Sequence, residues 1–168
     1  TVPGVVTHGV VRSAANIDRS WIDLDAEKLF GKRLGLEVHV VNDADAAGLA
    51  EARYGAGRGV RGLVHVITLG TGIGGAVLLD EKIQRGRFGI AGEFGHMQVV
   101  PDGQRCECGN RGCWEQYASG NSLVRDAKAL LAEGSPEALS LLHYVPDKDP
   151  AHLVGPDVSR AAVEIGRA

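Results

Sequence analysis

The sequence lacks any stretch in which lysine and arginine gather. Its 18 basic and 21 acidic residues give a formal charge of −3, without a basic stripe. Because a surface that binds nucleic acid needs clustered Lys and Arg, we expect no nucleic-acid partner. Residues 1–4 likewise lack the basic and then apolar segments of a signal peptide, which makes the cytoplasm the expected location.

A convincing membrane-spanning segment is also missing. Residues 62–79 are eighteen uncharged residues, which meets the length criterion for a membrane helix. They include five glycines, however, and their apolar residues fall into two short blocks. We therefore predict two buried strands, over 63–68 and 76–79, joined by a turn. With 44% hydrophobic and 23% charged residues, the chain has the composition of a soluble globular protein, and no membrane partner is expected.

The spacing of apolar residues predicts an α/β protein. Besides the two strands around the turn, the predicted strands are a pair over 5–11 and single strands over 36–41 and 82–84. The predicted helices are 23–34, 44–54, much of 114–142 and a last helix capped by Asp157. Residues 91–113 are predicted to be loop.

Glycine is abundant, with 24 of 168 residues, about twice its usual share. The turn over 68–75 exposes backbone N–H groups, and two threonine hydroxyls add donors, a combination that suits phosphate oxygens. No Lys follows as in a Walker loop, and a strand rather than a helix comes next, so a plain hairpin is the alternative. The candidate phosphate-binding residues are Thr68, Gly70, Thr71, Gly72, Gly74 and Gly75.

The sequence has only three cysteines, Cys106, Cys108 and Cys113, and His96 stands ten residues before the first of them. An odd number of cysteines cannot all form disulfides, and a bridge between positions two apart is strained. Three thiolates and one imidazole match the ligands of a structural zinc site. Four protein ligands leave no place for a reactive water, so the predicted zinc is structural. Reduced cysteines without a metal are the alternative.

Asn42 and Asp43 stand where the predicted strand 36–41 gives way to the helix 44–54. Polar groups at strand ends open onto the ligand crevice of α/β folds, so Asp43 is a candidate catalytic residue. The alternative is that Asp43 or Asp45 caps the helix, since Asp is a favoured N-cap residue.

Two further carboxylates lie close to the cysteine loop in sequence. Glu93 precedes His96 by three residues, and Glu115 follows Cys113 by two. A metal-bound loop would hold both rigidly. A local role for Glu115 is the alternative, because a carboxylate at the start of a helix also interacts favourably with the helix dipole.

These residues together form a family pattern. Asn42-Asp43-Ala44-Asp45-Ala46-Ala47 comes first, and the glycine turn, Glu93-Phe94-Gly95-His96 and Cys106-Glu107-Cys108-Gly109-Asn110-Arg111-Gly112-Cys113-Trp114-Glu115 follow in order. The pattern resembles the ROK family of repressors and sugar kinases, marked by Glu-x-Gly-His and Cys-x-Cys-Gly-x-x-Gly-Cys-x-Glu. The resemblance spans nearly the whole chain, and within the family it is closest to actinobacterial glucokinases.

The resemblance implies the actin-like, ribonuclease-H-like ATPase fold, in which two α/β lobes close on sugar and nucleotide. Residues 1–46 would be the C-terminal part of the small lobe, and residues 47–168 part of the large lobe, including the zinc loop 96–113. The family's first phosphate loop and its adenosine region have no counterpart in this sequence. We therefore expect the chain to be a segment of a longer kinase.

The resemblance also assigns roles to single residues. Asp43 matches the catalytic base of an enzyme that phosphorylates glucose at its 6-hydroxyl with ATP and Mg²⁺. The residues that match sugar-binding positions are Asn42, Asp43, Glu93, His96 and Glu115, with Asn16 as a further one. His96 would serve both zinc and sugar, since a metal fixes the tautomer of its imidazole ligand. Residues 68–75 match the second phosphate loop.

Other functions stay open at this point. A sugar-sensing repressor of the same family would use the region only to bind ligand, and the stretch 42–59 also resembles polyphosphate-dependent glucokinases. A zinc-stabilised interaction domain without catalysis explains the cysteines but not Asn42-Asp43. The family also suggests a homo-oligomer, either a dimer or a tetramer.

Overall fold

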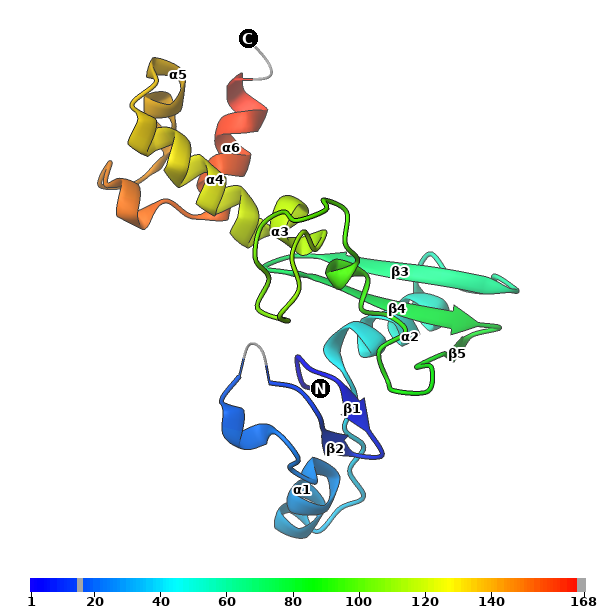
Figure 1. Cartoon of the computed structure of the whole chain (residues 1–168). Coiled ribbons are helices and arrows are strands. Elements are labelled where there is room, and N and C mark those ends of the chain that lie inside the picture. Colours follow the sequence, from blue (N-terminus) through cyan, green and yellow to red (C-terminus); the bar gives the residue numbers. More distant parts are fainter. Residues whose placement is uncertain (15–16, 166–168) are drawn as a thin grey trace.

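The computed structural model describes residues 1–14 and 17–165, so Asn16 lies outside the described residues. Three parts follow one another along the chain (Figure 1). A hairpin with one helix comes first, a three-stranded sheet with one helix comes next, and a group of helices forms the C-terminal part. Each part has its own cluster of buried apolar side chains.

The N-terminal part is built on a tight hairpin. Strands β1 (Val6–Thr7) and β2 (Val10–Val11) are antiparallel, and His8 and Gly9 between them have φ angles of 51° and 74°. Two positive φ angles in a two-residue connection are typical of the type I′ turn, whose twist matches that of the paired strands. The strand pair predicted over 5–11 is confirmed.

Helix α1 (Ala26–Leu34) follows the hairpin. The Asp25 carboxylate accepts the Lys28 N–H at 3.0 Å and caps the first turn, and Gly35 ends the helix with a left-handed φ of 65°. The helix predicted over 23–34 therefore begins three residues later than expected. The buried cluster of this part consists of Val2, Val6, Val11, Ala26 and Val40, with Trp21, Phe30 and Val38 packed against it.

The strand predicted over 36–41 is wrong. In the part of the chain that the structure describes, residues 36–41 form no strand or bridge; the parallel bridge that follows them pairs Val2 with Asn42, through the Val2 N–H to Val41 O and the Asp43 N–H to Val2 O. The alternation of apolar residues reflects packing on the N-terminal cluster rather than strand pairing.

Helix α2 (Asp43–Tyr54) begins one residue earlier than predicted. Its N-cap is Asn42, whose Oδ1 accepts the Asp45 N–H at 3.0 Å. The expectation that Asp43 or Asp45 caps the helix is therefore wrong, because the Asn42 side chain fills that position. The Asp43 side chain instead stands exposed at the first helical residue.

The middle part is an antiparallel sheet, and its strands in spatial order are β3 (Leu63–Leu69), β4 (Ile73–Leu79) and β5 (Lys82–Ile83). The two strands predicted around the glycine turn are confirmed, but β4 begins three residues earlier than expected. The prediction that both are buried is wrong for β3, whose residues alternate between exposed and half-buried because Val64 and Val66 pack on the buried cluster while the residues between them face away from it. Gly74 and Gly75, predicted to lie in the turn, pair with Thr68 and Ile67 in the ladder. The connection between the strands is thereby reduced to residues 70–72.

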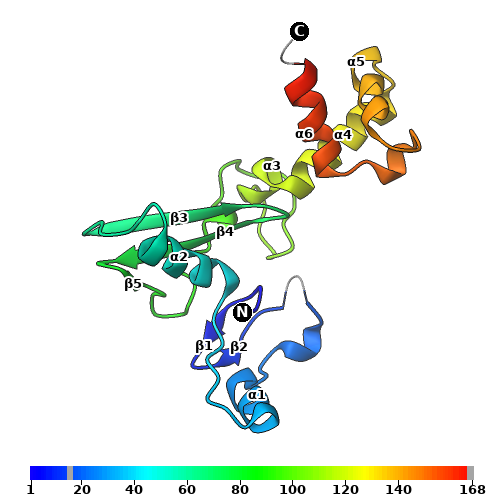
Figure 2. The same ribbon diagram turned by 180° about the vertical axis from the view of Figure 1, so that it is seen from behind.

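Helix α2 lies against one face of this sheet (Figures 1 and 2). At Gly48 the approach is close enough that an added Cβ would lie 2.5 Å from the Ala76 Cβ on β4. Ala52, Ala76 and Leu78 form the buried cluster between helix and sheet. Small residues on the facing surfaces therefore allow this close packing.

Replacing Gly48 by alanine is expected to lower the free energy of unfolding by about 1 kcal/mol. Alanine gains about 1 kcal/mol in helix propensity, but overpacking against Ala76 costs about 1–3 kcal/mol. Chemical denaturation measures the change. Gly155→Ala is the control, because the methyl group there meets only Val124, at 3.9 Å. A Gly48→Ala protein as stable as the wild type would contradict the close packing.

The C-terminal part consists of helices. They are α3 (Glu115–Ala118), α4 (Gly120–Glu133), α5 (Pro136–Leu139) and α6 (Gly155–Ile165), with short 3-10 helices over Ser140–Tyr144 and Pro150–His152 between the last two. Two more 3-10 helices, Arg19–Trp21 and Phe94–His96, lie earlier in the chain. Reciprocal hydrogen bonds between Ser119 and Ser122 cap α4, and left-handed Gly134 ends it. Leu131 and Leu153 belong to the buried cluster among these helices.

The last helix begins two residues before Asp157, which was predicted to cap it. Asp157 lies inside the first turn, where its Oδ2 accepts the Val154 N–H at 3.2 Å. The carboxylate thus satisfies a free N–H group at the start of the helix from within it, rather than from the cap position.

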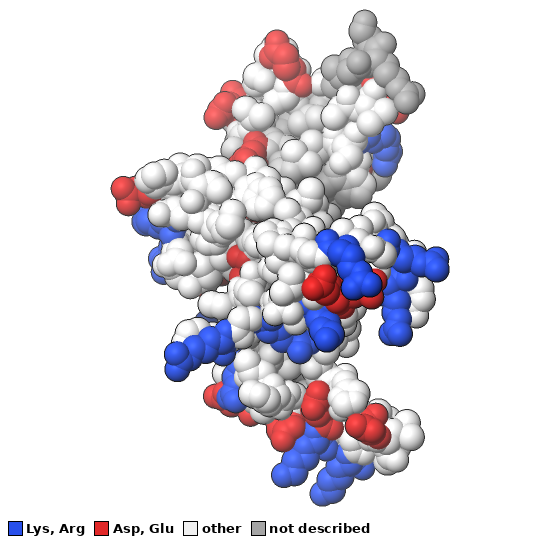
Figure 3. Space-filling view, turned by 90° about the vertical axis from the view of Figure 1, so that its right-hand side faces the viewer, with Lys and Arg blue, Asp and Glu red and all other residues white. Residues whose placement is uncertain are grey.

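Acidic and basic side chains lie near one another on the face seen in Figure 3, around α1 and around the sheet.

Within residues 1–14 and 17–165, every helix is too short or too polar to cross a lipid bilayer.

Candidate active site and metal centre

A cavity of about 670 Å³ lies where the N-terminal part meets the sheet. Apart from Asn16, which lies outside the described residues, the residues predicted to bind sugar or phosphate line it. The lining residues are Pro3, Gly4, Ser13, Asn42, Asp43, Ala44, residues 68–75, Glu93, His96 and Glu115. Five segments that are distant in sequence therefore supply one site: they lie within residues 3–13, 42–44, 68–75 and 93–96 and at Glu115.

Asn42 and Asp43 enter the cavity from the start of α2. The Asn42 Nδ2 donates to Gly4 O at 3.1 Å, while its Oδ1 caps the helix, so the amide is fixed in one orientation. One of its two N–H donors is left for a ligand. The Asp43 Oδ1 accepts the Ala44 N–H at 2.9 Å, and the carboxylate is exposed to the cavity. This wall combines a fixed amide with an accessible carboxylate.

The glycine turn between β3 and β4 is held in place by the helices that follow the cysteine loop. The Glu115 Oε2 accepts the Ile73 N–H at 2.8 Å, and a side chain at Gly72 would collide with this carboxylate. The Gly120 N–H donates to Gly70 O at 2.8 Å. The turn is therefore positioned by α3 and by the first residue of α4.

The segment that carries Glu93 and His96 lies directly on β4. A Cβ atom at Gly92 would collide with Gly75 O, and one at Gly95 would collide with Ile73 O. Glycine at these positions lets the short 3-10 helix touch the strand backbone. The segment consequently holds the Glu93 and His96 side chains at the cavity wall.

Carboxylates dominate the electrostatics of the cavity. Burial raises the pKa of the Glu93 carboxyl above its ordinary value. The His96 ring, whose Nε2 lies 3.9 Å from Glu93 Oε2, opposes this rise, while Asp45, Glu115 and Asp43 add to it. Carboxylates are hydrogen-bond acceptors, so the cavity suits a neutral ligand that is rich in hydroxyl donors.

The three cysteines and His96 come together beside this cavity. Their four ligand atoms lie within 4.8 Å of one another. The Cys108 and Cys113 Sγ atoms are 3.7 Å apart, and the Cys106 Sγ lies 3.6 Å from the His96 Nδ1. Zn–S bonds of about 2.3 Å and Zn–N bonds of about 2.0–2.1 Å in a tetrahedron imply about 3.8 Å between two sulfurs and about 3.6 Å between sulfur and nitrogen. The donor set and its spacing fit a zinc ion.

His96 belongs to both sites. Its Nδ1 faces the Cys106 sulfur, and its Nε2 faces the Glu93 carboxylate in the cavity. A metal on Nδ1 would leave Nε2 as the protonated nitrogen, a donor toward the cavity. The two ends of the loop between His96 and Cys113 are joined by a hydrogen bond from the Val99 N–H to Gly112 O. A side chain at position 112 would collide with the Val100 backbone.

Several polar residues near the site were missed from the sequence. Ser13 lines the cavity, and its Oγ accepts the Val5 N–H at 2.9 Å. A polar side chain shortly after the end of β2 was the available signal. A second cavity, of about 640 Å³, lies beside Gly70 and Thr71 and is lined in part by Arg125 and Lys128. These two helix residues carry no local signal of a site.

Comparison with known proteins gives consistent results. A model of the ROK family matches residues 1–162. The chain is 46% identical over 149 residues to a glucokinase of Streptomyces coelicolor, covering 89% of this chain and 46% of that protein. It is 56% identical over 100 residues to a polyphosphate glucokinase of Mycobacterium tuberculosis, covering 59% of this chain and 36% of that protein.

The structure is similar to the crystal structure of a ROK family glucokinase from Streptomyces griseus in complex with glucose and AMPPNP. The TM-score is 0.83 with 46% sequence identity, covering 96% of this chain and 51% of that one. The predicted partial actin-like α/β fold is therefore confirmed. The chain spans about half the length of the Streptomyces glucokinases it matches.

Proposed function

The chain belongs to the ROK family, and from this premise we propose that it provides the sugar site and one phosphate loop of an ATP-dependent glucokinase. The observation that carries the proposal is the single cavity shared by Asp43, the acidic sugar-site candidates and the glycine turn. Glucokinases of two Streptomyces species are among its relatives, and AMPPNP, bound in one of them, is an analogue of ATP.

In the proposed reaction, Asp43 removes the proton from the 6-hydroxyl of glucose. The 6-oxygen then bonds to the γ-phosphorus of MgATP as the bond from that phosphorus to the β,γ-bridging oxygen breaks. ADP leaves, glucose 6-phosphate forms, and the proton stays on Asp43 until solvent takes it. Catalysis of this kind rests on positioning and charge stabilisation rather than on covalent chemistry of the protein.

The other cavity residues would hold the sugar hydroxyls. Glu93 and Glu115 are acceptors, whereas Asn42 and His96 each offer a donor. Hydrogen bonds of both kinds would fix the 6-hydroxyl beside Asp43. The choice among hexoses would then depend on single contacts to one substituent.

The glycine turn would bind the phosphates of MgATP. The candidate residues are Thr68, Gly70, Thr71, Gly72, Gly74 and Gly75. The Gly70 N–H donates to Gly72 O at 3.0 Å, and Gly74 and Gly75 lie in the β3–β4 ladder, so the donors would be the two threonine hydroxyls and the N–H groups at the tip of the turn. Because Glu115 and the first residue of α4 hold the turn, its donors need little reorganisation during the reaction. The remaining nucleotide contacts would come from outside the matched half of the relatives' length.

We further propose that His96, Cys106, Cys108 and Cys113 hold a structural zinc ion. With four protein ligands, zinc supplies rigidity and fixes the His96 tautomer, and it activates no water. We also propose a cytoplasmic location and assembly into a dimer or tetramer. The two lobes would divide between residues 46 and 47. The lobe boundary would fall inside α2, the helix that begins at the catalytic base.

The Glu93→Gln substitution is expected to lower kcat/KM for glucose by about 10–100-fold, mainly through KM. An amide keeps the shape of the side chain but loses a charge-assisted hydrogen bond, worth about 1.5–3 kcal/mol. Steady-state kinetics with saturating MgATP measures the change. Glu107→Gln, a substitution at an exposed residue of the cysteine loop, is the control. Equal KM values for the two variants would argue against Glu93 as a sugar ligand.

The proposed activity is tested by a coupled assay of the full-length protein. Phosphorylation of glucose with MgATP is expected, and mannose and N-acetylmannosamine serve as competing hexoses. The similarity to a polyphosphate glucokinase makes polyphosphate the second donor to test. Turnover with polyphosphate but not with MgATP would show that the phosphate donor is polyphosphate rather than ATP. Glucose binding without turnover on any donor would favour a sugar-sensing repressor.

A further inference from the structure

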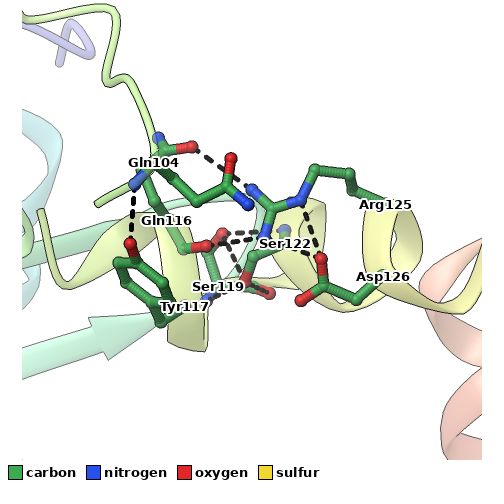
Figure 4. Close-up of polar contacts among 7 residues, drawn as sticks. All are labelled: Gln104, Gln116, Tyr117, Ser119, Ser122, Arg125 and Asp126. Carbon is green, nitrogen blue, oxygen red and sulfur yellow. Dashed lines mark hydrogen bonds and ion pairs between the residues drawn. The ribbon is translucent and has the colours of Figure 1, made fainter. Parts of the chain in front are cut away.

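Three consecutive side chains of α3 contact three different segments of the protein. Glu115 accepts the Ile73 N–H of β4, and Tyr117 accepts the Gln104 N–H at 2.7 Å in the cysteine loop. Between them, the Gln116 side chain turns to the metal cluster, and its Nε2 lies 3.7 Å from the Cys106 Sγ. One short helix therefore contacts the cavity, the cysteine loop and one of the cluster sulfurs; Figure 4 shows the contact of Tyr117 with Gln104 in the loop.

Arg125 on α4 fixes the orientation of the Gln116 amide. Its Nη2 donates to Gln116 O at 2.8 Å, and its Nη1 donates to Gln116 Oε1 at 3.4 Å (Figure 4). A guanidinium group has donors only, so the atom that faces it must be the amide oxygen. The amide nitrogen, with its two N–H groups, must then face the Cys106 sulfur. Asp126 holds Arg125 from the other side at 2.8 Å.

Cys106 needs such a donor more than an exposed cysteine does. Its side chain is buried, with 2% of the residue exposed, so water has little access to the sulfur. A thiolate that binds a metal keeps negative charge, and a buried charge without hydrogen bonds is costly. An N–H group aimed at the sulfur lowers that cost and orients the ligand toward the metal.

We propose that Gln116 is a positioning residue of the metal centre, which donates an N–H to the Cys106 thiolate and is itself oriented by Arg125. The inference goes beyond the proposed kinase reaction and rests on the proposed metal at the cysteine cluster. It makes α3 the link between the metal and the cavity, because Gln116 is adjacent to Glu115, which holds the glycine turn.

The test compares Gln116→Met with Gln104→Met in the full-length protein. Methionine is similar in length to glutamine but has no N–H, and Gln104 is an exposed residue of the same loop whose own contact is made by its backbone. Zinc affinity is measured by competition with a chelator. The Gln116→Met protein is expected to bind zinc about 10–100-fold more weakly, the usual effect of losing such a partner, and the control to match the wild type.

The cobalt-substituted protein gives a second readout that reports directly on the sulfur. Losing a hydrogen bond raises the energy of the sulfur lone pairs, so the sulfur-to-cobalt charge-transfer band of Gln116→Met is expected at longer wavelength. A change in packing alone does not raise the lone-pair energy in this way. The control variant is expected to keep the wild-type band.

Further outcomes separate this inference from the functions it rests on. If Gln116→Met fails to fold, Arg125→Met tests the same step, because the Gln116 amide can then rotate away from the sulfur. This variant is expected to bind zinc more weakly and to show the sulfur-to-cobalt band at longer wavelength. Wild-type affinity and an unshifted band in the variant tested would overturn the role of Gln116 alone. A wild-type protein that binds neither zinc nor cobalt would overturn both the metal centre and the role of Gln116. Kinase activity is assayed separately, so the proposed reaction stands or falls on its own result.

Discussion

The Asp43→Asn protein is expected to phosphorylate glucose about 10²–10⁴-fold more slowly than the wild type. A general base contributes a factor of this size, and an amide cannot accept the proton of the 6-hydroxyl. Asparagine keeps the shape of the side chain and can still accept the Ala44 N–H, so the start of α2 is preserved. The loss should therefore appear in kcat, with little change in the affinity for glucose.

Asp45→Asn is the matched control. Asp45 lies two residues further along α2 and forms an ion pair with Arg85 at 2.8 Å, but it does not line the cavity. Its replacement removes one negative charge from the same helix turn and should leave kcat within about threefold of the wild type, since partly exposed ion pairs contribute little. An Asp43→Asn enzyme within threefold of the wild type would overturn the assignment of the base.

The second large effect is expected from the metal ligands. Cys113→Ser should weaken zinc binding by more than about 100-fold, because even residues outside the ligand set change metal affinity by about 10–100-fold. Cys113 is fully buried, and its loop leads directly into α3. Loss of the metal should displace Glu115 and His96, lower the melting temperature, and lower kcat/KM for glucose by about tenfold or more.

Metal analysis, thermal unfolding and kinetics of the same preparations test this prediction. Treatment of the wild type with a strong chelator should reproduce the effects of Cys113→Ser, and added zinc should reverse them. Glu107→Gln, between two of the ligands in sequence, is expected to keep the metal. Full activity and an unchanged melting temperature in the metal-free wild type would show that the centre does not support the sugar site.

Local sequence signals predicted much of the fold. The end of α1 was predicted at Leu34, because Gly35 takes a left-handed φ that depends on neighbouring residues alone, whereas the N-cap, Asp25, was expected inside the helix. The strands around the glycine turn were recognisable because their apolar residues are contiguous and glycines separate them. The cysteine cluster was predictable for a related reason, since its ligands lie within eighteen residues and glycines allow the loop to curl.

Features that depend on distant partners could not be predicted in this way. The segment 36–41 alternates like a strand, but among the described residues no strand pairs with it, and only the bridge between Val2 and Asn42 follows it. The N-cap of α2 went to Asn42 rather than to an aspartate, a choice that also depends on Gly4 O. The meeting of Asp43, Glu93 and the glycine turn in one cavity was expected only from the resemblance to a family. Gln116 carries no local signal, because its partner is a sulfur ten residues away.

Product analysis by ³¹P NMR tests the central claim most directly. The full-length protein is incubated with glucose and MgATP, and the phosphorus resonances are followed with time. Glucose 6-phosphate and ADP are expected to accumulate in equal amounts, and to do so far more slowly with Asp43→Asn. ADP and inorganic phosphate without a sugar phosphate, or no consumption of ATP although glucose binds, would contradict the assignment of this cavity as a glucose-phosphorylating site.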